Sequence, residues 1–254
     1  MLSRGKIKKI NSLKDKKTRQ ISQLFTIEGI KSVKEISLSA FITIEELYAV
    51  PEFHALASSI APGRTEEISP EDMRRISSQT TPEGLLAVCR IPNHGHFAFK
   101  EGQLVIALDD IRDPGNLGTI VRLADWFGVE DILCSKSTVD LYNPKTVQST
   151  MGSIARVRVH YTDLAETLAR CPLKVYGAFL EGSDIYRANL KPEGVIVIGN
   201  EANGISPAVE AVISEKITIP RFGRTHGAES LNAAIAASVI ISQFISSTHG
   251  RSGK

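Results

Sequence analysis

The chain has 254 residues, of which 42% are hydrophobic and 23% charged, and its formal net charge is +2. These values are close to the average for globular proteins, so they exclude a wholly disordered or fibrous chain and allow one large domain or two smaller ones. The basic N-terminus is not followed by an apolar segment, and no run of about 18 apolar residues occurs, so neither a signal peptide nor a membrane span is expected. Three widely spaced cysteines argue against a disulfide framework or a zinc site and favour a reducing cytoplasm: Cys89, Cys134 and Cys171.

Basic residues are concentrated at the N-terminus. Residues 1–34 contain ten Lys or Arg against two acidic residues, a local charge of +8, whereas residues 101–254 carry −2. Lys and Arg gain affinity for polyanions by releasing counterions from phosphates. The clustering therefore favours a nucleic-acid partner over a merely solvated surface. The side chains expected to bind the nucleic acid are Lys6, Lys8, Lys9, Lys14, Lys16, Lys17 and Arg19.

The first ninety residues alternate short segments of strand and helix character. Strands are predicted over 24–29, 37–43 and 84–91, and helices over 30–36, near 52–60 and after Ser69-Pro70. The turn-forming stretch 92–96 predicts a linker, and hence one domain over 1–95 and a second over 96–254. His94 and His96 could share a face of this linker, but no third metal ligand is nearby. A hinge loop is therefore favoured over a metal site.

Longer apolar strands follow the linker. They are predicted over 104–108, 131–135, 174–180, 194–199 and 216–220, with helical patterns between them. Continuous apolar runs indicate strands covered on both faces, and so a parallel α/β sheet. Such sheets bind ligands beyond the carboxyl ends of their strands, which makes the loops after these strands the candidate site.

The loop after strand 104–108 leads into a predicted helix over 117–127. Asn116 is expected to be the N-cap of this helix, and Gly118 permits close approach of a ligand or backbone. Arg122 lies about one turn beyond Gly118, on the same side. This grouping favours a phosphate-binding site over an ordinary surface arginine.

Two further loops carry polar residues. The loop over 200–207 is rich in Asn and Gly and suits a small polar ligand, but it lacks both the dinucleotide and the P-loop spacing, so a nicotinamide or ATP enzyme is disfavoured. After strand 216–220, Ser230 and Asn232 stand at the head of an alanine-rich helix that is expected to be buried. His226 lies nearby, but no acid partner accompanies it, so a hydrolase triad is also disfavoured.

Together the three loops resemble the motifs of the SpoU (TrmH-like) family, which belongs to the SPOUT class of RNA 2′-O-ribose methyltransferases. The resemblance covers about residues 104–245, with the motifs in the family's order. They are Asn116-x-Gly118-x-x-x-Arg122, then Ile198-Gly199-Asn200-Glu201-Ala202-x-Gly204-Ile205, then Ile219-Pro220 followed by Ser230-Leu231-Asn232-Ala233. The segment FTIEGIKSVKEI also resembles the start of the family's small substrate-binding domain, which is similar to the ribosomal L30e fold.

This resemblance implies an α/β protein with two domains. The C-terminal domain would have a mostly parallel sheet and a deep trefoil knot, and a small L30e-like domain would precede it. It also implies a homodimer with active sites completed across the interface, S-adenosylmethionine as cofactor and no metal. The reaction implied is methyl transfer to a ribose 2′-hydroxyl of ribosomal or transfer RNA. The stretch 221–229 is longer than in many relatives, with Thr225-His226-Gly227 as the excess, which affects the shape expected for the cofactor lid.

The resemblance also assigns roles to single residues. The cofactor contacts it implies are Gly199, Asn200, Glu201, Asn203, Gly204, Ile219 and Leu231, and the catalytic positions are Asn116, Arg122, Glu201, Ser230 and Asn232. Because a guanidinium keeps its proton with a pKa above about 12, Arg122 is expected to clamp a phosphate and stabilise the developing alkoxide rather than act as a free base.

Two alternatives stay open. The first is an RNA-binding protein of the same fold that has lost catalysis, which the joint presence of the five polar positions argues against. The second is a base methyltransferase, which the Asn-x-Gly-x-x-x-Arg motif disfavours.

Overall fold

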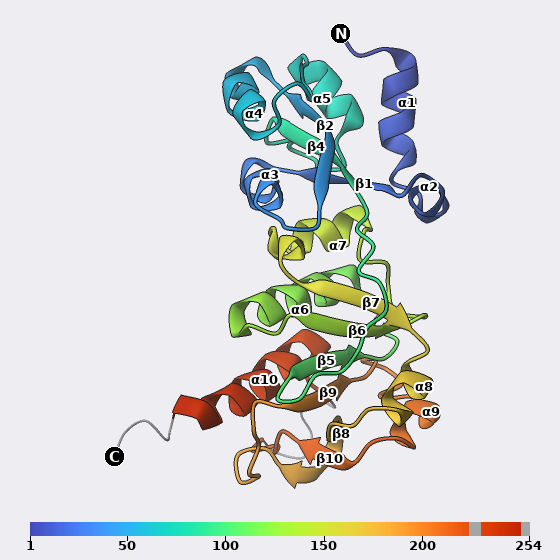
Figure 1. Cartoon of the computed structure of the whole chain (residues 1–254), viewed down its shortest axis with the longest axis vertical. Coiled ribbons are helices and arrows are strands. Elements are labelled where there is room, and N and C mark those ends of the chain that lie inside the picture. Colours follow the sequence, from blue (N-terminus) through green and yellow to red (C-terminus); the bar gives the residue numbers. More distant parts are fainter. Residues whose placement is uncertain (224–229, 250–254) are drawn as a thin grey trace. The chain divides into compact units, whose positions relative to one another are not determined.

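The structure, a computed structural model, describes residues 1–223 and 230–249 (Figure 1). Thr225-His226-Gly227, the excess expected in the cofactor lid, therefore lie outside the described residues. The chain forms two compact units, one of Met1–Asn93 with Asp140–Arg156 and the other of His94–Val139 with Val157–Lys254. The first boundary falls in the turn-rich stretch 92–96, whereas the return of 140–156 to the first unit has no counterpart in the sequence pattern.

The first unit contains a four-stranded sheet of order β1-β4-β2-β3. Strand β4 pairs antiparallel with β1 and β2, and β3 pairs parallel with β2. The elements in chain order are α1 (Arg4–Ser12), α2 (Lys16–Ser22), β1 (Leu24–Glu28), α3 (Ile30–Ser37), β2 (Thr43–Ala49), η1 (Pro51–Phe53), α4 (His54–Ile60), β3 (Thr65–Glu67), α5 (Pro70–Ile76), β4 (Leu85–Arg90), α7 (Pro144–Ser149) and η2 (Ser153–Ala155).

The strand predicted over 37–43 is wrong. Helix α3 continues to Ser37, and the Ser39 hydroxyl then accepts hydrogen bonds from the backbone N–H groups of Phe41 and Ile42 (3.4 and 3.2 Å), which makes a turn. The strand begins only at Thr43. A bulge between Ile44 and Glu46 interrupts the alternation by which this strand could have been found.

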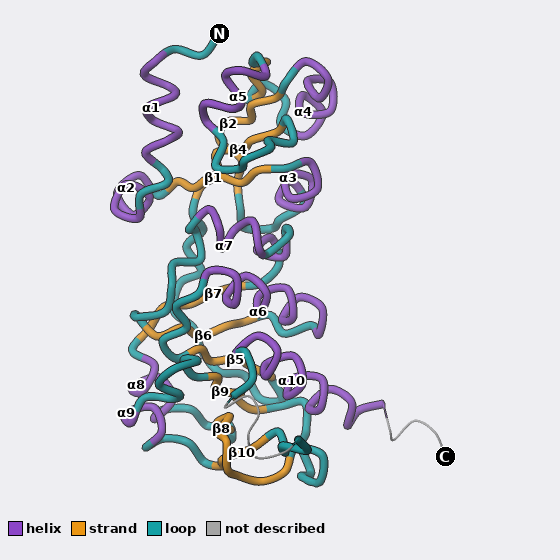
Figure 2. The backbone as a smooth tube through the Cα atoms, turned by 180° about the vertical axis from the view of Figure 1, so that it is seen from behind, coloured by secondary structure: helices purple, strands orange, loops and turns teal. Residues whose placement is uncertain are grey.

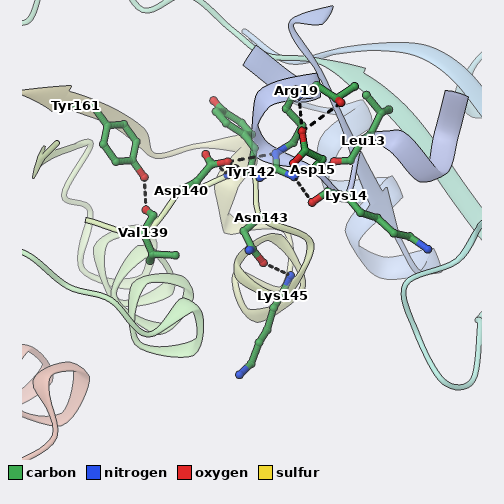
Figure 3. Close-up of polar contacts among 11 residues, drawn as sticks. Leu13, Lys14, Asp15, Arg19, Val139, Asp140, Tyr142, Asn143, Lys145 and Tyr161 are labelled. Carbon is green, nitrogen blue, oxygen red and sulfur yellow. Dashed lines mark hydrogen bonds and ion pairs between the residues drawn. The ribbon is translucent and has the colours of Figure 1, made fainter. Parts of the chain in front are cut away.

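Arg19 on α2 is buried and joins two distant parts of the first unit. Its guanidinium donates to the carbonyl oxygens of Leu13 and Lys14 at 2.8 Å each, and its Nη2 pairs with the Asp140 carboxylate at 2.6 Å (Figure 3). Only 3% of the Arg19 side chain is exposed. The ion pair thus connects the α1–α2 turn to the segment 140–156.

The second unit is built on a six-stranded sheet of order β10-β8-β9-β5-β6-β7, in which all adjacent strands are parallel (Figure 1). This confirms the predicted α/β fold class. The elements are β5 (Leu104–Leu108), α6 (Pro114–Phe127), β6 (Asp131–Ser135), β7 (Arg158–Thr162), α8 (Leu164–Ala169), β8 (Val175–Asp184), β9 (Gly194–Ile198), α9 (Pro207–Glu210), β10 (Glu215–Thr218) and α10 (Ala233–His249).

All five predicted strands of this sheet are present, whereas β7 was not predicted. Strands β5, β6 and β9 are buried along their whole length. The sequences of β5 and β9 contain no polar side chain, whereas β6 begins with Asp131 and ends with Ser135. Strand β7 lies at the sheet edge and has only one buried residue, Val159. Helices α6 and α10 lie side by side against the sheet (Figure 2). No helix among the described residues is long and apolar enough to cross a membrane.

The amino end of β6 carries a buried carboxylate. Asp131 receives two hydrogen bonds from Arg158, at 2.8 and 2.7 Å, one from Gln103 at 2.9 Å, and lies 2.9 Å from His160 Nε2. Burial alone would raise the pKa of Asp131, but the contacts with His160 and Arg158 outweigh it and hold this pKa well below its usual range.

Arg19→Ala should lower the free energy of unfolding by about 3 kcal/mol, because it leaves the Asp140 carboxylate without its buried partner. Urea denaturation measures this change. Lys16→Ala on the exposed face of α2 is the control and should change the value by less than about 0.5 kcal/mol. Equal effects of the two substitutions would show that the Arg19 ion pair does not stabilise the first unit.

Asp131→Asn should destabilise the protein at pH 7 by about 3 kcal/mol, since Arg158 loses its carboxylate partner. The folded pKa of Asp131 lies below the unfolded value of about 3.9, so its contribution is complete above that value and is lost as the pH falls. The wild type should therefore have a higher thermal midpoint than Asp131→Asn at pH 5, and this difference should become smaller as the pH is lowered to 2. A difference independent of pH would contradict the assignment. Glu130→Gln, at the exposed partner of Arg158, should have little effect.

Candidate active site

Two neighbouring strands bring the first two motifs together. Strands β5 and β9 are parallel and adjacent, so the loops that follow them lie at the same edge of the sheet. Helix α6 begins after the β5 loop with Asp113 as its N-cap, whose side chain accepts a hydrogen bond from the Asn116 backbone N–H at 2.8 Å. The prediction that Asn116 is the N-cap is wrong, because Pro114 occupies the first helical position and Asp113 caps the helix before it.

Hydrogen bonds join Asn116 to the other two motifs. Its Nδ2 donates to Glu201 Oε1 in the loop after β9, and its Oδ1 accepts from Asn232 Nδ2 at 2.9 Å. Asn232 Oδ1 accepts from the N–H groups of Ala234 and Ile235, at 3.0 and 3.3 Å, and so caps the start of α10. Three of the predicted site residues, one from each motif, are thus in direct contact.

The loop after β9 is held by its own polar groups. Asn200 is buried, and its Nδ2 donates to the Asp110 carbonyl at 2.8 Å while its Oδ1 accepts from the N–H groups of Ala202 and Asn203, at 2.9 and 3.1 Å. The buried Asp109 carboxylate accepts from the Ser206 N–H at 2.8 Å. Asn200 therefore shapes the loop. The supporting residues Asp109 and Asp110 were not singled out from the sequence, although two carboxylates directly after a buried strand are a usable signal.

Gly199 is required where the loop closes on itself. A Cβ at this position would lie 2.4 Å from the Gly204 carbonyl carbon and 2.5 Å from the Ile205 nitrogen. Both are backbone atoms and cannot move aside as a flexible side chain could. Gly204 itself has a φ of +68°, a conformation that favours glycine.

A cavity of about 660 Å³ opens beside this loop, within the range of about 300–1,000 Å³ typical of small-molecule sites. It is lined by the carboxyl ends of β8, β9 and β10 and the start of α10. All seven residues expected to contact the cofactor line it, together with Ser230: Gly199, Asn200, Glu201, Asn203, Gly204, Ile219 and Leu231.

Arg122 lies apart from this cavity. It is exposed on α6, six positions after Asn116 and therefore about 120° away around the helix axis. No described residue pairs with its guanidinium. Within one chain, Arg122 therefore forms no described hydrogen bond or ion pair with Asn116 or with its partners Glu201 and Asn232.

The described residues include no group of three His, Cys, Asp or Glu that could hold a metal ion. The ring of His94, one of the two linker histidines, lies 5.7 Å from the ring of His160, which in turn lies 5.2 Å from the ring of Phe97. Burial lowers the pKa of His94.

Comparison with known proteins gives matches to both units. The sequence model of the SpoU rRNA Methylase family matches residues 103–242, and that of the MRM3-like substrate binding domain matches residues 4–87. The chain is 30% identical to the 23S rRNA (guanosine(2553)-2′-O)-methyltransferase RlmP of Bacillus subtilis, over 93% of this chain and 94% of that protein.

Solved structures agree with these matches. A TrmH-family protein from Porphyromonas gingivalis superposes with a TM-score of 0.87 at 38% identity, covering 96% of this chain and 98% of the other. An AdoMet-bound rRNA methyltransferase from Sinorhizobium meliloti superposes with a TM-score of 0.84 at 26% identity, covering 96% and 95%.

Gly199→Ala should destabilise the loop after β9 by about 1–3 kcal/mol, because the added methyl group collides with the backbone of Gly204. Hydrogen exchange of the amides in residues 200–206 measures this, and they should exchange faster in the variant. Gly223→Ala is the matched control, since a Cβ there meets nothing within 4 Å. Unchanged exchange in Gly199→Ala would refute the close approach.

Proposed function

The chain belongs to the SpoU rRNA methylase family, and we infer that it transfers a methyl group from S-adenosylmethionine to a ribose 2′-hydroxyl of RNA. The observation that carries this inference is the contact of Asn116, Glu201 and Asn232 at the edge of the cavity-bearing loops. A chain that kept the fold only as a scaffold would not need these three polar side chains in one arrangement.

The cavity suits the cofactor. Ile219 and Leu231 supply apolar contacts for an adenosine, and the loop containing Gly199 and Gly204 offers backbone polar groups for the remainder. When bound, S-adenosylmethionine supplies an electrophilic methyl group on a positively charged sulfur. We assign its binding to the seven predicted cofactor contacts that line the cavity.

Arg122 is proposed to act on the RNA. Its guanidinium stays protonated and can hold a phosphate while stabilising negative charge that develops on the attacking 2′-oxygen. Its exposure on α6, without a described partner, leaves it available for this role. We propose that Asn116, Glu201, Ser230 and Asn232 align the ribose, and that the proton leaves to phosphate or water.

We further propose that two copies of the chain complete each site, with Arg122 of one copy serving the site of its partner. Two observations support this. Arg122 lies away from the Asn116 contacts of its own chain, and the neighbouring helices α6 and α10 expose large apolar side chains, Trp126 at 83% and Ile235 at 54%.

The family also implies the knot expected in the second unit.

The first unit is proposed to bind the RNA. The predicted domain boundary at residue 95 lies close to its break after Asn93, but the unit also includes Asp140–Arg156. Two of its lysines are already paired, Lys6 with Glu66 and Lys9 with Glu46. Because Arg19 is buried and fully engaged, we leave it out of the proposed RNA-binding set, which retains Lys6, Lys8, Lys9, Lys14, Lys16 and Lys17.

Ribosomal RNA is the substrate to test first, since the similar Bacillus subtilis protein is named for 23S rRNA. The cytoplasm is the proposed location. Its reducing conditions suit the three free thiols, Cys89, Cys134 and Cys171.

Arg122→Ala should reduce methyl transfer to unmethylated rRNA at least 100-fold while leaving S-adenosylmethionine affinity within about twofold, because Arg122 does not line the cofactor cavity. Tritiated methyl incorporation and calorimetry measure the two effects. Near-normal transfer by this variant would overturn the role assigned to Arg122.

Mixing Arg122→Ala with Asn116→Ala tests the shared site. If each site takes Arg122 from the partner, heterodimers restore one of their two sites, and a random mixture regains about one quarter of wild-type activity. Absence of any recovery after subunit exchange would place Arg122 in the site of its own chain. Each variant alone is the control for residual activity.

A further inference from the structure

A second hollow lies wholly within the first unit, whereas the cofactor cavity belongs to the second. It has a volume of about 470 Å³ and is bordered by the start of α7, strand β1, the turn after α1 and the segment after α5. Residues far apart in sequence therefore share one groove, and about half of them come from the returning segment 140–156. The groove is lined by Lys14, Thr26, Glu28, Ser78, Gln79, Asn143, Pro144, Lys145, Val147 and Gln148.

The groove carries a net positive charge, because its lining holds two lysines and one glutamate. Lys14 Nζ donates to the neutral Ser77 carbonyl at 2.9 Å, and no described acidic side chain forms an ion pair with Lys14 or Lys145. The Glu28 carboxylate in the lining accepts hydrogen bonds from the Ser77 hydroxyl and the Ser78 N–H, the latter at 2.8 Å, and pairs with neither lysine. These neutral donors leave its charge in place, so one of the two lysine charges exceeds it. This differs from α1, where Lys6 and Lys9 are neutralised by glutamates.

Three side-chain amides accompany these two lysines. Asn143 Oδ1 accepts from the Lys145 backbone N–H at 2.9 Å, which leaves its NH₂ group directed to no described acceptor. The amide groups of Gln79 and Gln148 likewise have no hydrogen-bond partner among the described residues, and Gln148 is exposed. Unpaired amides can donate to and accept from the edges of unstacked bases, and ammonium groups hold the adjoining phosphates.

We propose that this groove binds one or two unpaired nucleotides of the substrate RNA, with Lys14 and Lys145 on phosphates and the amides of Gln79, Asn143 and Gln148 on base edges. The proposal rests on the proposed function, because it takes RNA as the substrate. It assigns part of substrate selection to residues 143–148, which lie outside the span matched by the substrate-binding domain. The groove is thus a selection site separate from the one that binds the cofactor.

The charge contribution is tested with an unstructured twelve-nucleotide RNA and the full-length protein. Lys14→Gln/Lys145→Gln should weaken binding about tenfold at low salt and lower the slope of log K against log salt by about 1.4, or 0.7 for each phosphate that is no longer neutralised. Lys31→Gln/Lys34→Gln is the matched control, with the same charge change on α3 lysines of the same unit that lie outside the groove. Equal effects of the two double variants would show that only net charge matters and would overturn the proposal.

The amide contribution is tested separately, since Gln148→Ala changes no charge. It should weaken RNA binding severalfold with an unaltered salt slope. In addition, RNA containing 4-thiouridine should crosslink under ultraviolet light to the peptide that holds residues 143–148. Crosslinks confined to other peptides would contradict the groove. Two controls show that a loss of RNA binding is not caused by misfolding. The variants should bind S-adenosylmethionine as the wild type does in calorimetry, and the single variant Lys145→Gln changes only an exposed side chain.

Methyl transfer separates failure of this proposal from failure of the proposed function. With rRNA from cells that lack the protein, Lys14→Gln/Lys145→Gln should raise KM about tenfold and leave kcat within twofold. If the wild type methylates this RNA and both lysine double variants match it, the groove proposal fails while the function stands. If the wild type transfers no methyl group to any RNA, the function fails, and the binding and crosslinking results still decide on the groove.

Discussion

The carboxamide of Asn116 holds the candidate site together. It donates to Glu201 and accepts from Asn232, so one side chain links the segments that follow three different strands. This link depends on the parallel order of the sheet, because strands that run in the same direction, such as β5, β9 and β10, deliver their following loops to the same edge. The asparagine can serve in this way because its amide both donates and accepts.

The candidate site and the buried Asp131 cluster lie at opposite ends of that sheet. The carboxyl end carries the loop closed at Gly199 and the cavity beside it, whereas the amino end carries Asp131 with its partners Arg158, His160 and Gln103. The carboxylate at the amino end is fully paired, so it stabilises the fold and is not available to a ligand. Arg122, in contrast, has no partner among the described residues, which is consistent with the role that we propose for it on the RNA.

The first unit includes a segment, residues 140–156, that returns to it after the chain has entered the second unit. Residues 140–156 are joined to α2 through the buried pair of Arg19 and Asp140 (Figure 3). They also complete the groove that contains Lys14 and Lys145. The N-terminal basic residues consequently differ in what they can do. Arg19 is buried in a structural ion pair, Lys6 and Lys9 pair with surface glutamates, and the others form no ion pair with a described residue.

Local sequence patterns determined the α/β class, the strands over 104–108 and 131–135, and the three loops of the site, because a strand buried on both faces has a mostly apolar sequence and its loop must follow it. They did not determine that Asp113 rather than Asn116 caps α6, that the strand expected over 37–43 begins at Thr43, or that Arg19 is buried. Each of these outcomes depends on a partner or a backbone irregularity that no periodicity encodes. The contacts of Arg19 with Asp140 and of Asn116 with Asn232 span 121 and 116 positions. Only the tertiary structure could decide them, because the partner of a polar side chain is set by which segments the folded chain brings together.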